Sequence, residues 1–151
     1  MVDIKVKGNG VDPARSEAAK RPATTAGGTG KAAFGTSLKT ARRQVLEGDL
    51  RAMLDQVRGL GDRFLKAPDE DKLDAYKDAI SQYLERVSKE TFSLRQELGD
   101  LRDGQQKVYQ LVETVKQDID GLTRETLQKD KALGLLGSLD DIRGLVLDLF
   151  T

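Results

Sequence analysis

A group of acidic residues between positions 69 and 78 has types and spacing that could carry chemistry. Carboxylates gathered over a short stretch can bind a divalent cation or transfer protons. These acids, however, follow Pro68, which suits a helix start, and acids in a first turn complement the helix dipole. We interpret them as helix-start and solvent-facing residues. They are Asp69, Glu70, Asp71, Asp74 and Asp78.

The glycine-rich stretch at residues 27–31 resembles a phosphate-binding loop only in part. That loop needs a glycine at position 25 and a serine or threonine after the lysine. The chain has Thr25 and Ala32 at these positions. No hydrophobic strand precedes the stretch to hold such a loop, so we interpret it as a linker and predict no nucleotide site.

Several other chemistries are excluded by the residue types of the chain. The sequence contains no histidine and no cysteine, so it lacks the commonest general base, thiol nucleophiles and thiolate metal sites. A calcium loop around Gly121 would place Lys116 first and Leu127 last, where carboxylates are required. We therefore expect no catalytic residue, no metal and no cofactor, and a protein that is not an enzyme.

The charges of the chain balance, with 25 basic and 25 acidic residues. Such a chain has no overall field that would recruit a polyanion, which argues against nucleic acid as a partner. No stretch reads as a signal peptide or as an apolar membrane span. We expect a cytoplasmic protein that does not span a membrane.

The domain organisation follows from a change in composition near residue 36. Residues 1–36 contain two of the three prolines and six of the fifteen glycines, without apolar periodicity. This composition is typical of flexible segments, because it cannot bury enough apolar surface to offset its ordering entropy. We predict a flexible tail over 1–36 and a helical domain over 37–151.

Apolar residues at intervals of three and four in that domain indicate an all-α fold, an antiparallel four-helix bundle. The first helix is expected over about 49–66, with Asp49 as N-cap after a lead-in containing Phe34 and Leu38. The second starts near Pro68 and runs for 25–30 residues. The third is expected over 105–129 and the fourth over 132–150, with Ile142 and Leu149 in the core.

Glycines inside the expected helices suggest close approaches. Gly59 and Gly61 lower helix propensity by about 1 kcal/mol each, which indicates close packing or a weak last turn. Gly137 and Gly144 are seven residues apart and so share a face of the last helix. A neighbouring backbone can approach closely there.

The second helix is longer than the expected first helix can cover. Its strict repeat, from Leu73 through Ile80 and Val87, continues past residue 90. An uncovered apolar flank usually marks a contact site. We expect this flank to meet a second copy of the chain or the lead-in segment. It comprises Phe92, Leu94, Leu98 and Leu101.

Several stretches resemble a known family. The C-terminal run 135–151 is similar to the C-terminal end of proteins of the YaaR family, which are small uncharacterised bacterial proteins. Four further stretches resemble this family as well: residues 61–65, 73–77, 83–84 and 119–127. The resemblance covers about residues 50–151. It implies a helical bundle in the cytoplasm and supplies no active site and no function.

Three functional hypotheses from different classes remain. The first, which we favour, is a non-enzymatic helical module that acts through contact with an unknown protein partner or as a homo-oligomer. The second is a weak binder of nucleic acid or an anionic surface. It would use Lys39, Arg42 and Arg43 together with the N-terminal tail, in which six basic residues outnumber three acidic ones. The third is an enzyme, which would require a concave pocket with buried carboxylates.

Overall fold

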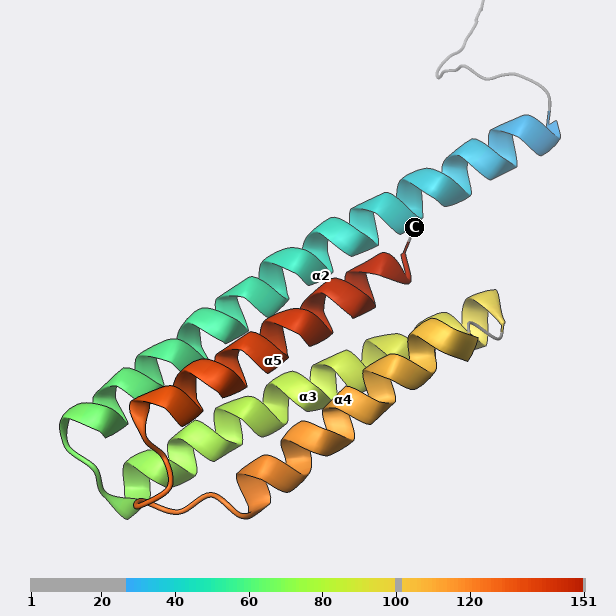
Figure 1. Ribbon diagram of the computed structural model, residues 1–151. Helices are drawn as coiled ribbons and strands as arrows, with labels where there is room; N and C mark the ends of the chain where they lie inside the picture. The colour runs from blue at the N-terminus through green and yellow to red at the C-terminus, as the bar shows by residue number, and fades with distance from the viewer. Residues whose placement is uncertain (1–26, 100–101, 151) are drawn as a thin grey trace, which may run out of the picture. The chain divides into compact units, whose positions relative to one another are not determined.

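The computed structural model describes residues 27–99 and 102–150, with side chains from Ser37 onward except at Leu98 and Arg102. All regular elements in these ranges are helices: α2 (Gly27–Lys66), α3 (Glu70–Leu98), α4 (Arg102–Asp120) and α5 (Lys129–Asp148) (Figure 1). The chain divides into two compact units, 1–41 and 42–151. Within the second unit the four helices form an antiparallel bundle, which confirms the predicted fold class.

Helix α2 is much longer than predicted. It begins at Gly27, so the expected boundary between residues 36 and 37 falls inside a helix, and residues 1–26 of the predicted tail lie outside the described residues. Asp49 is therefore not an N-cap. Its carboxylate lies inside the helix and pairs with the Arg86 guanidinium of α3 at 3.0 Å. A possible cap residue does not start a helix where the preceding residues are helix-compatible.

The start of α3 agrees with the prediction that the acids after Pro68 serve the helix terminus. Asp69 is the N-cap, and its side chain accepts a hydrogen bond from the Lys72 amide at 2.8 Å. Hydrogen bonds from the Lys72 side chain and then from its backbone lower the pKa of Asp69. At the other end Gly99 caps α3 with a φ of 83°, a conformation that favours glycine.

Helix α4 ends nine residues earlier than predicted, at Asp120 rather than Lys129. Residues 121–128 form an irregular connection in which Thr123 and Thr126 accept hydrogen bonds from each other's backbone amides. Threonine hydroxyls that bond locally compete with helix formation. Leu122 and Leu127 are nevertheless buried, so the apolar stripe continues where the helix does not.

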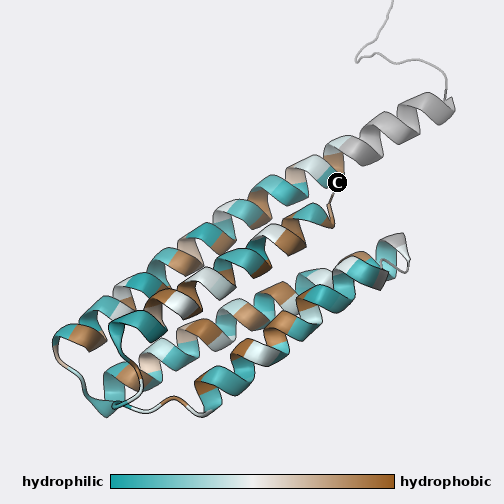
Figure 2. Ribbon diagram, in the orientation of Figure 1, coloured by the Kyte–Doolittle hydropathy of each residue, from teal (hydrophilic) through white to brown (hydrophobic). Residues whose placement is uncertain are grey.

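The core is built from the apolar stripes of all four helices. Brown and teal positions alternate along each helix in Figure 2, as expected for amphipathic helices with one buried face. The apolar residues of α3 that recur every seven positions lie in this core. Tyr83 on α3 donates a hydrogen bond to the Leu139 carbonyl of α5 at 2.7 Å, and burial raises the pKa of its hydroxyl. Ile142 is fully buried, as predicted, whereas Leu149 is half-buried at the edge of the core.

The two glycines near the end of α2 differ in their surroundings. A Cβ added to Gly61 would lie 3.1 Å from Cε1 of the buried Tyr76, whereas one added to Gly59 would meet nothing within 4 Å. The predicted close packing therefore holds for Gly61.

Alanine substitutions should separate these two glycines. Gly59→Ala should stabilise the protein by up to about 1 kcal/mol through helix propensity. In Gly61→Ala the same gain is opposed by overpacking against Tyr76, which costs about 1–3 kcal/mol. Urea denaturation of both variants measures the difference. A Gly61→Ala protein as stable as Gly59→Ala would show that the Tyr76 ring relaxes freely.

Candidate functional site

The structure separates the four residues of the predicted contact flank. Phe92 is 53% exposed, but Leu94 is only 1% exposed and belongs to the core. The side chain of Leu98 and all of Leu101 lie outside the described residues. Leu94 is therefore covered within the chain and is not available to a second copy, while a contact through Phe92 stays a prediction.

The physical reason is the length of α2. The prediction assumed that the first helix ends far short of the C-terminal half of α3. Instead, Arg42 of α2 pairs with Glu97 of α3 at 2.6 Å, beyond the position of Leu94. Helix α2 thus still lies beside α3 at the level of Glu97.

An apolar hollow instead lies where the C-terminal part of α2 meets the start of α5. Its volume is about 120 Å³, and its mouth carries Leu133, which is 58% exposed. Ligand pockets typically measure about 300–1,000 Å³, so this hollow suits a side chain better than a cofactor. The apolar lining consists of Val57, Gly61, Leu65, Tyr76, Ala132, Leu133 and Leu136.

The hollow continues along the same two helices into a second, more open depression. This depression is lined by Leu54, Arg58, Gly137 and Asp140, and it shares Leu133 and Leu136 with the first. We call the two together the α2–α5 groove. A Cβ added to Gly137 or Gly144 would meet nothing within 4 Å. The close neighbour expected at these glycines is thus not found among the described residues.

Charged side chains border the α2–α5 groove on both helices. Asp62 and Lys129 both line the first hollow, and neither forms an ion pair with any described residue. Among the described residues, Arg58 pairs with Asp55 alone, at 3.5 Å, and both side chains are mostly exposed. Exposed pairs of this kind contribute little to stability. The border charges therefore have capacity to bind a charged surface.

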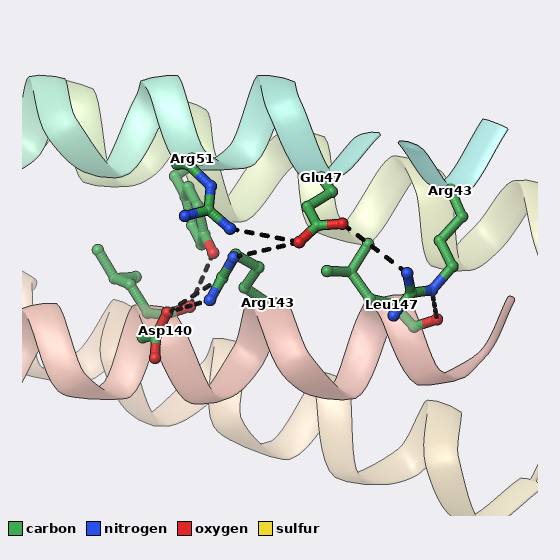
Figure 3. A network of polar contacts seen from close by, with 8 residues as sticks. Arg43, Glu47, Arg51, Asp140, Arg143 and Leu147 are labelled. Atoms are coloured by element: carbon green, nitrogen blue, oxygen red, sulfur yellow. Dashed lines mark hydrogen bonds and ion pairs between the residues drawn. The ribbon is translucent and has the colours of Figure 1, made fainter. Parts of the chain in front are cut away.

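Farther along, the seam between α2 and α5 is closed by polar contacts (Figure 3). Glu47 of α2 lies between three guanidiniums, those of Arg43, Arg51 and Arg143, at 3.3 to 3.9 Å. Arg143 also contacts Asp140 at 2.9 Å. Low α2 numbers meet high α5 numbers here, so the two helices run antiparallel.

Two of the basic residues named in the nucleic-acid hypothesis, Arg42 and Arg43, also make contacts within the bundle. Arg43 donates from Nε to the Leu147 carbonyl at 3.2 Å. Arg42 binds Glu97 and lies with its guanidinium carbon 5.5 Å from the centre of the Phe150 ring. Both arginines thus bind other helices of the bundle instead of forming a simple solvated face.

Tyr76 is the buried titratable residue of the groove lining. Burial raises the pKa of its hydroxyl to about 12, so it stays protonated at neutral pH and is not a base there. Among the described residues no three acidic side chains gather in a way that could hold a metal ion. The geometry supplies an apolar hollow bordered by charged side chains.

The groove was not predicted from the sequence, because it depends on which helices meet. Two sequence signals relate to it. Gly61 leaves room beside Tyr76, and Leu133 belongs to the apolar stripe of the fourth helix, although α5 turns it outward. Neither signal identifies the helix on the other side of the groove.

The fold is a helical bundle with an apolar groove between α2 and α5. The chain belongs to the family described as "Protein of unknown function (DUF327)", whose model matches residues 10–150. Comparisons with curated proteins and with solved structures found no match. In the described part of the chain, no helix combines the length and apolar character that crossing a bilayer requires.

Proposed function

We propose that this protein is a non-enzymatic helical module that acts through protein–protein contact at the α2–α5 groove. The observation that carries this proposal is an apolar socket open to solvent, with a large apolar side chain, Leu133, 58% exposed at its mouth. Interfaces commonly centre on such an apolar socket with a polar border. We further propose that the matched family is the one known as YaaR and that the protein works in the cytoplasm.

The contents of the groove support binding over catalysis. Its acidic residues, Asp62 and Asp140, lie at the exposed border and not on the floor. A catalytic carboxylate is usually buried, because burial adjusts its pKa to proton transfer. The sequence also contains no histidine or cysteine that could serve instead. The enzyme hypothesis therefore has less support than the binding hypothesis.

Site-specific photo-crosslinking tests the proposal. A benzoylphenylalanine placed at Leu133 of the full chain, in the cell that produces it naturally, should yield a discrete protein adduct. The same group at exposed Glu113 on α4 is the control and should yield none. Adducts of equal yield at both positions, or none at Leu133, would reject the groove as a contact surface.

A further inference from the structure

We infer that the α2–α5 groove binds a second copy of this chain around a twofold axis parallel to the two helices. This inference rests on the proposed function and names its partner. It follows from the two opposite charges at the border of the first hollow, which make the groove complementary to itself.

The border charges at the first hollow have opposite signs on the two helices. There α2 contributes the anion Asp62 and α5 contributes the cation Lys129. Farther along, Asp140 of α5 is already paired with Arg143 at 2.9 Å. The first hollow therefore has an unpaired anion on one side and an unpaired cation on the other among the described residues.

A twofold rotation about an axis parallel to the helices exchanges the two sides. It places α2 of one copy opposite α5 of the other, at the same level of the groove. Asp62 then faces Lys129 of the second copy. By symmetry this pair forms twice, as an isologous interface requires. An unrelated partner would have to reproduce this pattern independently.

The apolar part of the groove obeys the same symmetry. Leu133 lines both the first hollow and the second depression, so the rotation brings it to the mouth of the other copy's groove. Gly137 and Gly144 of α5 carry no side chain, and a Cβ added at either would meet nothing within 4 Å among the described residues. The second copy would supply the close neighbour that these two glycines permit.

The area of the groove allows a weak dimer. Helix α5 lines the groove from Lys129 to Asp140, a stretch of about 18 Å. Two neighbouring helices are together about 20 Å wide. The face is thus about 360 Å² per copy, so a dimer buries about 700 Å², which is the size of a weak and transient interface. We expect reversible, concentration-dependent association that weakens as salt is added.

A charge-exchange experiment tests this arrangement on the full chain. Asp62 and Lys129 are exposed and form no ion pair with the described residues, so reversing their charges leaves the fold intact. Asp62→Lys and Lys129→Glu, each alone, turn both intermolecular pairs repulsive. Each should raise the dimer dissociation constant about tenfold or more in sedimentation equilibrium.

Mixing the two single variants should restore the dimer. In the mixed dimer the lysine introduced at position 62 of one copy faces the glutamate introduced at position 129 of the other. The remaining pair joins the unchanged Lys129 to the unchanged Asp62, so both pairs attract again. Combining Asp62→Lys with Lys129→Glu in one chain should restore association as well. If Asp62 and Lys129 attracted each other only within one chain, mixing the two variants could not restore association. Restored association therefore shows that the two charges interact between copies.

Two further variants complete the test. Leu133→Asp should leave the chain monomeric, because it places a charge at the apolar centre of the interface. Phe92→Asp, at an exposed position of α3, should leave association unchanged. A wild-type monomer at all concentrations, a mixture that fails to associate, or a dimer lost only with Phe92→Asp would overturn the inference. If the crosslink at Leu133 captures a different protein while the chain stays monomeric, the proposed function survives and the second copy does not.

Discussion

Leu94→Asp is expected to leave the chain largely unfolded under conditions in which the wild-type protein is folded. Leu94 is 1% exposed and lies in the core. Removing a buried leucine side chain costs about 2–5 kcal/mol, and forcing a carboxylate into apolar surroundings adds several kcal/mol more. This total is comparable to the roughly 5–15 kcal/mol that stabilises a typical domain.

The matched control is Phe92→Asp, two residues earlier on the same helix. Phe92 is 53% exposed, so its replacement should change the free energy of unfolding by no more than about 0.5 kcal/mol. Far-ultraviolet circular dichroism and thermal melts of both variants measure the contrast. A Leu94→Asp protein that melts cooperatively near the wild-type temperature would show that Leu94 lies at the surface.

Ile142→Ala should lower the free energy of unfolding by about 2–5 kcal/mol. The Ile142 side chain is fully buried on α5, close in sequence to Leu139, whose carbonyl binds Tyr83 of α3. Deleting its outer carbons leaves a cavity that the surrounding side chains fill only in part. The urea midpoint should fall while its slope stays constant, since the surface exposed on unfolding hardly changes.

Alanine variants of two other leucines on the C-terminal side provide a comparison for the stability loss of Ile142→Ala. Leu133→Ala, at a position 58% exposed, should change stability by about 0.5 kcal/mol or less when measured at low protein concentration. Leu149→Ala, at a half-buried position, should fall between the two. A loss below about 1 kcal/mol for Ile142→Ala would contradict its place in the core.

Residue spacing alone was enough to predict the fold class and most of the core. The seven-residue row Leu73, Ile80 and Val87 is buried, as its spacing predicts. The position of the acids after Pro68 at a helix start was also predictable from local sequence, because Asp69 is the N-cap of α3. Periodicity predicts these features well, since the hydrophobic effect selects one helix face wherever the helix lies in the bundle.

Helix limits were less predictable. Asp49 has the side chain of an N-cap, yet it lies in the middle of α2 and pairs with Arg86. The stripe through Leu122 and Leu127 resembles a helix, yet threonine hydroxyls bond the backbone between them. The spacing of apolar residues predicts which residues are buried. It does not determine where a helix ends, because a helix and an irregular connection can bury the same residues.

The packing of the helices, in contrast, sets which apolar residues are covered and which remain exposed. Leu94 and Leu133 both belong to apolar stripes, but the first is in the core and the second is 58% exposed. The groove beside Leu133, with Asp62 and Lys129 at its border, exists because α5 lies against the end of α2. Exposure depends on the neighbouring helix, and the spacing within one helix carries no information about its neighbour.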